Sequence, residues 1–186
     1  PISGVRNKEQ KAEFYLPNGI EAVNIKGFKQ ANMQIKDNQS MVFDGIIATT
    51  PTWKDIEFIR KNTKLPLILK GITHPSYAKK AIEIGVNGIV VSNHGGRVLD
   101  TLVTTMDILP KIVEVVDNKI PILLDGGIIR GTDILKALAL GASAVMIGKP
   151  IMYGLATAGA LGVAHSLKIL KDELEISMAL TGCKTL

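Results

Sequence analysis

One pattern occurs four times between residues 51 and 150: a short apolar segment, a charged or glycine-rich loop, and then apolar residues at helical spacing. The apolar segments are residues 66–71, 88–91, 121–124 and 144–147. Such segments are typical of strands buried on both faces, and strands that alternate with helices pair in parallel because a parallel connection needs a crossover. The pattern therefore predicts an α/β fold, either a (β/α)₈ barrel or a doubly wound sheet.

Capping residues and apolar spacing predict the helices between and after these strands. A first helix begins at Pro51 with Thr50 as its cap, and a later one is capped by Thr132 or Asp133 and runs to Leu140. The other helices are expected at about 75–84, at about 103–116 and in an amphipathic tail that ends at Gly182. We divide the chain into a connecting segment with a mobile loop at 1–50, the strand–helix units at 51–166, and a C-terminal helix and tail at 167–186.

Composition excludes several classes of protein. The 186 residues are 46% hydrophobic, which suits one globular domain with a core. Cys183 is the single cysteine, so a disulfide framework and a cysteine metal site are excluded and a reducing, cytoplasmic setting is expected. The net charge of +5 is dispersed and only 4% of residues are aromatic, which argues against a nucleic-acid surface. No apolar run reaches membrane-spanning length, so we expect no membrane partner. We also expect no metal.

A histidine and an arginine follow the apolar segment 88–91 directly, in the sequence Ser-Asn-His-Gly-Gly-Arg. The imidazole of His94 titrates near neutrality and can take a proton from an alcohol, while the guanidinium of Arg97 can bind a carboxylate bidentately. A 2-hydroxy acid carries both groups. Gly95 and Gly96 would let substrate or a flat cofactor approach the backbone closely. His74, before a proline, and His165, within a helical stretch, are expected to be structural.

The full stretch Ser-Asn-His-Gly-Gly-Arg-x-Leu-Asp resembles the active-site signature of the FMN-dependent 2-hydroxy-acid oxidases and dehydrogenases, a family that includes glycolate and lactate oxidases. That family folds as a complete (β/α)₈ barrel, which takes about 250 residues. The resemblance covers essentially the whole chain and implies the second half of such a barrel, strands five to eight, with C-terminal helices.

The resemblance also implies roles for particular residues. His94 matches the catalytic base, Arg97 the clamp on the substrate carboxylate and Lys70 the cation that stabilises reduced flavin; Ser92 matches a further flavin contact. Whether the base removes the hydroxyl proton or the α-proton stays open. Arg6 resembles an arginine that comes near the substrate in lactate oxidases, with the alternative that it is one basic residue in a charged stretch.

Two glycine-rich loops match the family's FMN-phosphate segments, and in barrels the loops after strands seven and eight commonly bind phosphate. The matching residues are Asp125, Gly126, Gly127, Ile128, Ile129, Gly148 and Lys149. Ile129 replaces an arginine that grips the phosphate in the family, and Lys149 also stands where arginine is usual. Loss of one charge-assisted hydrogen bond costs about 1.5–3 kcal/mol, so weakened FMN binding is expected.

We therefore expect FMN-dependent oxidation of an L-2-hydroxy acid, of which L-lactate is the first choice, to the 2-oxo acid, with oxygen as acceptor and hydrogen peroxide as product. A half-barrel leaves sheet edges unpaired. This implies a partner: a missing N-terminal half-barrel, other copies of the chain, or a tetramer as in the family. Two alternatives stay open: a truncated or divergent half-barrel without catalysis, and a different barrel enzyme that binds a phosphate-bearing substrate.

Overall fold

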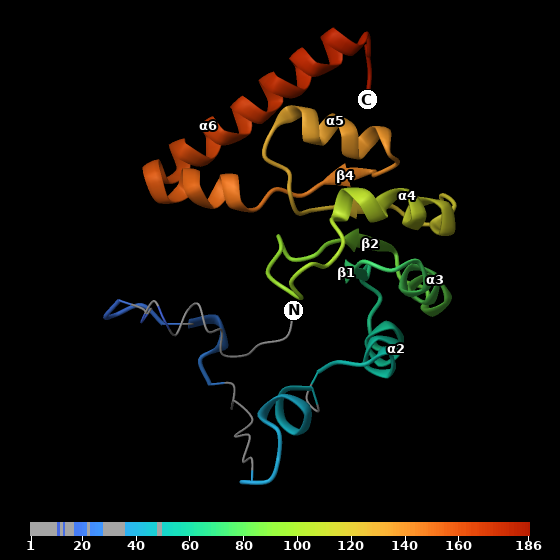
Figure 1. The fold of residues 1–186 in the computed structure, drawn as a ribbon, viewed down its shortest axis with the longest axis vertical. Coiled ribbons are helices and arrows are strands. Elements are labelled where there is room, and N and C mark those ends of the chain that lie inside the picture. Colours follow the sequence, from blue (N-terminus) through green and yellow to red (C-terminus); the bar gives the residue numbers. More distant parts are fainter. Residues whose placement is uncertain (1–10, 12, 14–16, 22, 28–35, 48–49) are drawn as a thin grey trace. The chain divides into compact units, whose positions relative to one another are not determined.

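The computed structural model describes residues 11, 13, 17–21, 23–27, 36–47 and 50–186 (Figure 1). They belong to two compact units, one within Ile2–Thr52 and the other comprising Trp53–Leu186. Among its described residues, the first unit includes two short helices, η1 at Val23–Ile25 and η2 at Met41–Ile46. Arg6, the candidate substrate contact, lies outside the described residues.

The second unit is built on a four-stranded sheet whose strands all run parallel. Its strands are β1 (Ile68–Ile72), β2 (Gly88–Val91), β3 (Ile122–Leu124) and β4 (Ala144–Val145), in the spatial order β1-β2-β3-β4. Consecutive strands are neighbours in the sheet and a helix intervenes between each pair, which confirms the predicted α/β fold and matches half of a (β/α)₈ barrel.

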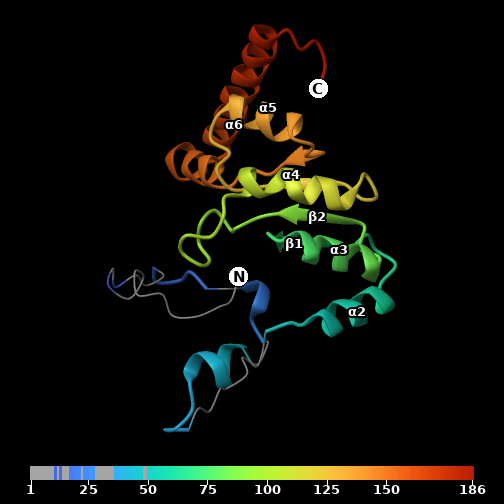
Figure 2. The ribbon, with the colours of Figure 1, turned by 45° about the vertical axis from the view of Figure 1, so that its right-hand side comes forward.

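Five helices accompany the sheet. They are α2 (Trp53–Asn62), α3 (Pro75–Ile84), α4 (Thr105–Val116), α5 (Gly131–Ala139) and α6 (Lys149–Thr181). In Figures 1 and 2, α2, α3 and α4 follow one another along the sheet, and α5 and α6 lie at its β4 end. His74 caps α3 by accepting a hydrogen bond from the backbone N–H of Ser76, in agreement with its expected structural role.

The hydrophobic core lies between the sheet and helices α3, α4 and α5. All four residues of β2 are buried, because this strand has a neighbour on each side. The helices contribute Ala78, Ala81, Leu109, Ile112, Val116, Ile134 and Ala137. Burial of each large aliphatic side chain stabilises the fold by about 1.5–3 kcal/mol. This packing holds the strand ends, and hence the loops that follow them, in fixed positions.

Two helices begin at other residues than the sequence predicts. Helix α2 begins at Trp53 rather than Pro51, and the backbone N–H of Thr50 instead closes a turn onto the carbonyl of Ile47. Helix α5 begins at Gly131, so neither Thr132 nor Asp133 is its cap. The Asp133 carboxylate reaches back to backbone N–H groups before the helix, which satisfies them from within the first turn.

Helix α6 is much longer than the predicted tail, because it starts at Lys149, soon after β4. It therefore crosses the predicted boundary between residues 166 and 167. Ala158 and Gly159 have non-helical dihedral angles and divide it into two arms. A Cβ added to Gly162 would overlap the carbonyl of Gly154, so the arms pack backbone to backbone at these glycines. Gly182 ends the helix in the left-handed conformation, as predicted.

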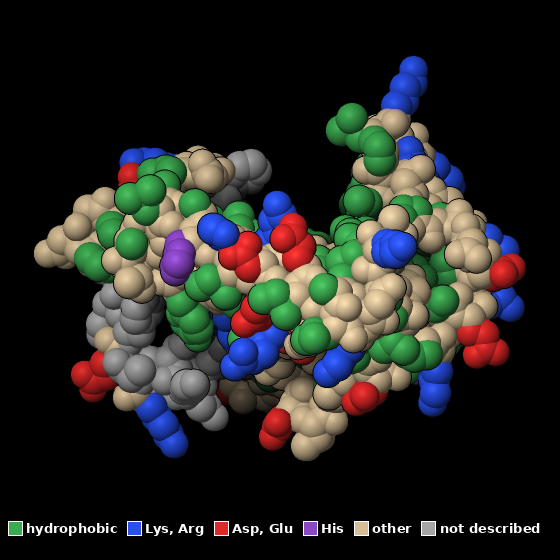
Figure 3. Space-filling view, turned by 90° about the horizontal axis from the view of Figure 1, so that it is seen from above, with side chains coloured by type: hydrophobic (Ala, Val, Ile, Leu, Met, Phe, Trp, Pro, Cys, Tyr) green, Lys and Arg blue, Asp and Glu red, His purple; other side chains and the backbone are tan. Residues whose placement is uncertain are grey.

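Figure 3 looks down on the end of the molecule that carries α6. Basic and acidic side chains are interspersed with hydrophobic ones on this face. Several α6 side chains are strongly exposed, including Leu161 at 80% and Leu180 at 83%. Within the part of the chain that the structure describes, no helix combines the length and apolar character needed to cross a membrane.

Candidate active site

A cavity of about 650 Å³ lies at the carboxyl ends of the strands. It is lined by His94, Gly95, Arg97, Asp125, Gly126, Gly127, Ile128, Ile129, Met146, Ile147, Gly148, Lys149, Pro150, Met152 and Tyr153. Because parallel strands deliver their following loops to one edge, residues from three loops and from the first turns of α6 meet there. Nine of the residues predicted for the site line this one cavity: His94, Arg97, Asp125, Gly126, Gly127, Ile128, Ile129, Gly148 and Lys149.

Lys70 and Ser92 are not among the residues that line the cavity, but Lys70 pairs with Asp125, which is. The Nζ atom of Lys70 is 2.7 Å from the Oγ of Ser92 and 2.7 Å from the Oδ2 of Asp125. These residues belong to or directly follow β1, β2 and β3, so the network crosses three adjacent strands. The other carboxylate oxygen of Asp125, Oδ1, is buried and has no hydrogen-bond partner among the described residues. It is therefore an acceptor available to a ligand's hydroxyl or N–H group.

A tight turn after β2 presents His94 to the cavity. His94 has a φ of 57°, and the two glycines after it also have positive φ. The backbone N–H of His94 donates to the Oγ of Ser92 at 3.1 Å, and that of Gly96 donates to the Oδ1 of Asn93 at 3.1 Å. A non-glycine residue in the left-handed region is strained, and such strain is often found at functional sites. The turn thus brings the imidazole and the Arg97 side chain to the same hollow.

Asn93 and Thr105 connect this turn to the loop after β3. The buried Thr105 hydroxyl donates to the carbonyl of Gly126 at 3.1 Å. A Cβ on Gly126 would lie 2.8 Å from the Oδ1 of Asn93, and the φ of this glycine is 87°. Neither residue was predicted to belong to the site. Asn93 could have been predicted from its place inside the Ser92–Arg97 motif. Thr105 could not, because nothing in the sequence distinguishes it from any other polar residue at the start of a helix.

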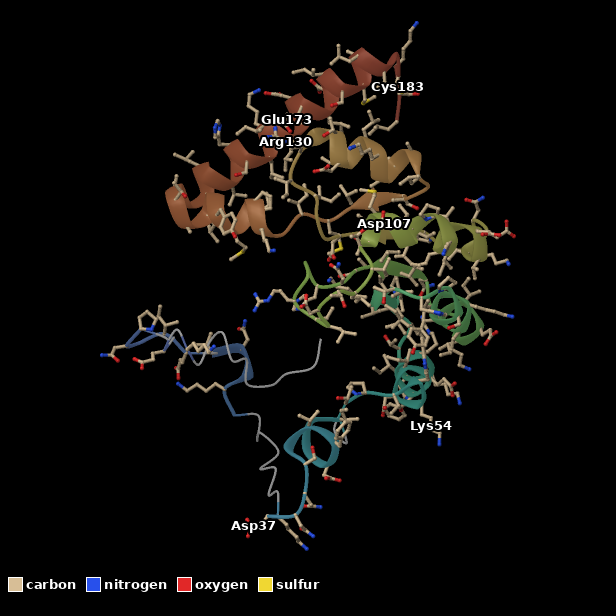
Figure 4. The ribbon with its side chains drawn as sticks, in the orientation of Figure 1. Asp37, Lys54, Asp107, Arg130, Glu173 and Cys183 are labelled. Carbon is tan, nitrogen blue, oxygen red and sulfur yellow. The ribbon has the colours of Figure 1, made fainter. Side chains whose placement is uncertain are left out.

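The loop between β3 and α5 is held by two carboxylates. The Oδ2 of Asp133 accepts from the backbone N–H groups of Ile129 at 3.0 Å and Arg130 at 2.9 Å. The Oε2 of Glu173 accepts from the N–H of Gly131 at 2.8 Å, and its Oε1 pairs with the Arg130 guanidinium at 3.4 Å. Figure 4 shows Arg130 and Glu173 next to each other. Glu173 was also missed, because it comes from α6, far along the sequence.

Lys149 links the start of α6 to the turn after β2 that carries His94. Its Nζ donates to the carbonyl of Gly95 at 3.2 Å. The sequence predicts Lys149 at the end of a strand, but β4 stops at Val145 and Lys149 is the first residue of α6. The lysine therefore adds a positive charge to the wall between two of the cavity's loops.

The residues present suit the ring and hydroxylated chain of a flavin. The cavity volume falls within the usual 300–1,000 Å³ of small-molecule sites. The buried Oδ1 of Asp125 can accept a hydrogen bond from the cofactor. No described atom lies within 4 Å of where a Cβ would be on Gly127 or Gly148, so a cofactor can approach the backbone closely at these two glycines. No group of three or more potential metal ligands occurs among the described residues.

Comparisons with known proteins agree with this geometry. Residues 1–186 match the family described as FMN-dependent dehydrogenase. The chain is 44% identical to an L-lactate oxidase of Nostoc sp., over 100% of this chain and 52% of that protein. It is 41% identical to 2-hydroxyacid oxidase 1 of Homo sapiens, over 99% of this chain and 51% of that protein.

Among solved structures, a mandelate oxidase mutant with the C4a-OH-FMN adduct is similar with a TM-score of 0.80 and 40% identity. The similarity covers 97% of this chain and 48% of that one. The chain thus spans about half the length of the curated relatives and structures that it matches.

Proposed function

Because the chain belongs to the FMN-dependent dehydrogenase family, we propose that it supplies the base, the carboxylate clamp and the flavin-binding loops for oxidation of an L-2-hydroxy acid. The observation that carries this proposal is the presence of His94 and Arg97 on the wall of one cavity with Asp125 and Lys149. L-lactate is the proposed substrate, since the Nostoc relative is named for it. The proposed product is the 2-oxo acid.

Each functional side chain has one task in this proposal. Arg97 binds the substrate carboxylate through its two-pronged guanidinium and so fixes the hydroxyl-bearing carbon. His94 accepts a proton in its imidazole ring, either from the hydroxyl or from the carbon, and typical general-base contributions are about 10²–10⁴-fold in rate. A bound FMN would supply the two-electron acceptor for this oxidation, and oxygen is the proposed final acceptor, with hydrogen peroxide as product.

Lys70 would stabilise negative charge on the reduced ring of a bound flavin. Its Nζ is held between Ser92 and Asp125 at 2.7 Å from each, so it needs little rearrangement to act. The buried Oδ1 of Asp125 would accept a hydrogen bond from the flavin's side chain. In this way one network both orients the cofactor and stabilises its reduced form.

A complete pocket requires a partner for the sheet. Among the described strands, β1 and β4 are the edges of the sheet, and Ile68 on β1 is 49% exposed. Unpaired edges with exposed apolar residues favour pairing with further strands. We propose that a complementary half-barrel, on the same protein or another copy, closes the sheet, and we expect little activity from these 186 residues alone.

The test compares the 186-residue chain with the intact protein, in which any flanking sequence is retained. Each sample is mixed with FMN and L-lactate, while visible flavin absorbance and peroxide are measured. The proposal predicts lactate-dependent bleaching and peroxide for the intact protein and little of either for the chain alone. An intact protein that retains no yellow flavin after excess FMN has been added and the free FMN removed would refute it.

One observation favours a second candidate, a divergent half-barrel without redox activity. Ile129, on a loop expected to bind phosphate, has no charge and is 66% exposed. A site that had lost its cofactor would tolerate such a residue. Colourless protein in excess FMN, with a normal unfolding transition, would support this second candidate.

A further inference from the structure

The backbone N–H groups of residues 129–131, at the end of the β3–α5 loop, already have partners. In barrels, the loops after strands seven and eight usually bind phosphate through backbone N–H groups. Here the N–H groups of Ile129 and Arg130 both donate to Asp133, and that of Gly131 donates to Glu173. Three consecutive donors are therefore already bound to carboxylates, whose negative charge would also repel a phosphate.

Few positively charged side chains near this loop are available to bind a phosphate. The guanidinium of Arg130 pairs with Glu173, and Figure 4 shows the two side chains close to each other. Arg130 is not among the residues that line the cavity, whereas the apolar Ile129 is. The lining residues with a permanent positive charge are Arg97 and Lys149. If Arg97 binds the substrate carboxylate, Lys149 is the lining cation that remains for a phosphate.

Lys149 also has a partner within the protein, since its Nζ donates to the carbonyl of Gly95 in the turn after β2. Around it the cavity wall is formed by Ile129, Met146, Pro150, Met152 and Tyr153. Ile129, Met146, Met152 and Tyr153 are at least 39% exposed. Such a wall favours an uncharged group over a phosphate dianion, because desolvation of a dianion next to apolar side chains is unfavourable.

We propose that this site recognises a flavin by its ring and ribityl chain and binds the phosphate-free flavin, riboflavin, almost as tightly as FMN. The proposal rests on the flavin-binding function inferred above and narrows its cofactor class. We expect the binding affinities of FMN and riboflavin to differ by about tenfold or less, the low end for a charge-assisted contact, because the one lysine that remains for the phosphate is a point charge and already donates to the carbonyl of Gly95.

The test is a titration of the intact apoprotein, with any flanking sequence retained, with FMN and with riboflavin, followed by quenching of flavin fluorescence. Dissociation constants within about tenfold of each other support the proposal. FMN binding that is tighter by more than this refutes the proposal while leaving flavin binding intact. Absence of binding by either flavin refutes both this proposal and the proposed function.

A gain-of-charge variant tests the role of residue 129 without relying on loss of folding. Ile129→Arg should raise the ratio of FMN affinity to riboflavin affinity by about tenfold to a hundredfold. Ile129→Gln is the matched control, since it is polar and uncharged, and its FMN-to-riboflavin affinity ratio should stay near that of the wild type. An Ile129→Arg protein with an unchanged ratio and a normal unfolding midpoint would contradict the assignment.

Discussion

The Nζ atom of Lys70 lies 2.7 Å from the Oδ2 of Asp125, and this ion pair joins β1 to the loop after β3 across the end of β2. The pair is partly shielded, since the Asp125 side chain is 16% exposed and that of Lys70 42%. Ser92 receives a hydrogen bond from the same amino group. The candidate site thus shares one polar network with the sheet, so a substitution at Lys70 is expected to affect the stability of the strand ends as well as the site.

Removal of the Lys70 amino group should destabilise the fold. Lys70→Met leaves the mostly buried carboxylate of Asp125 without its cation, and we expect a loss of about 1–3 kcal/mol in the free energy of unfolding. Lys80→Met is the control: its pair with Glu57 spans 3.8 Å between exposed side chains, so the loss should be about 0.5 kcal/mol or less. Urea unfolding measures both. Equal losses would show that the network does not stabilise the strand ends.

Gly126 should tolerate no side chain. In Gly126→Ala the new Cβ would meet the Oδ1 of Asn93 at 2.8 Å and the Oγ1 of Thr105 at 3.3 Å. The control Gly127→Ala has a similar positive φ of 81° but no atom within 4 Å of the new Cβ, so it isolates the backbone strain of about 1–2 kcal/mol. In thermal unfolding, Gly126→Ala should lose at least about 1 kcal/mol more unfolding free energy than Gly127→Ala does. A smaller effect at Gly126 than at Gly127 would contradict the packing described.

Contact between α5 and α6 depends on Gly131. A Cβ on this residue would overlap the backbone nitrogen of Leu174, so Gly131→Ala must separate the two helices and disturb the Glu173 contacts. We expect a loss of about 3 kcal/mol in unfolding free energy. Gly148→Ala adds a methyl group in open space and should cost about 0.5 kcal/mol or less. Similar unfolding midpoints for the two variants would mean that the helices are not in close contact.

Much of the fold follows from local features of the sequence. Helix α3 has the predicted bounds, because a histidine cap, a proline in the first turn and a glycine after the last turn mark its ends. The loop from Ser92 to Arg97 lies where the apolar run of β2 places it. The cavity gathers His94, Arg97 and the two glycine loops because the strands are parallel and their carboxyl ends coincide.

The rest depends on tertiary contacts that no local pattern shows. Glu173 reaches Gly131 because α6 breaks at Ala158 and Gly159 and its second arm runs along α5. Thr132 or Asp133 was predicted as the cap of α5, but both lie inside the helix, and the Asp133 carboxylate binds two N–H groups that precede it. Periodicity predicted only a separate tail helix. The first arm of α6 was missed because its glycines and small residues show little amphipathic periodicity.

The roles of His94 and Arg97 are tested by the rate at which L-lactate bleaches bound FMN in the intact protein without oxygen, measured by stopped-flow absorbance. We expect His94→Gln to slow bleaching by about 10²–10⁴-fold and Arg97→Met to raise the lactate concentration needed for half-maximal rate. Lys54→Met, on α2 (Figure 4), is the control and should bleach as the wild type does. A His94→Gln protein that binds FMN and bleaches at the wild-type rate would contradict the account.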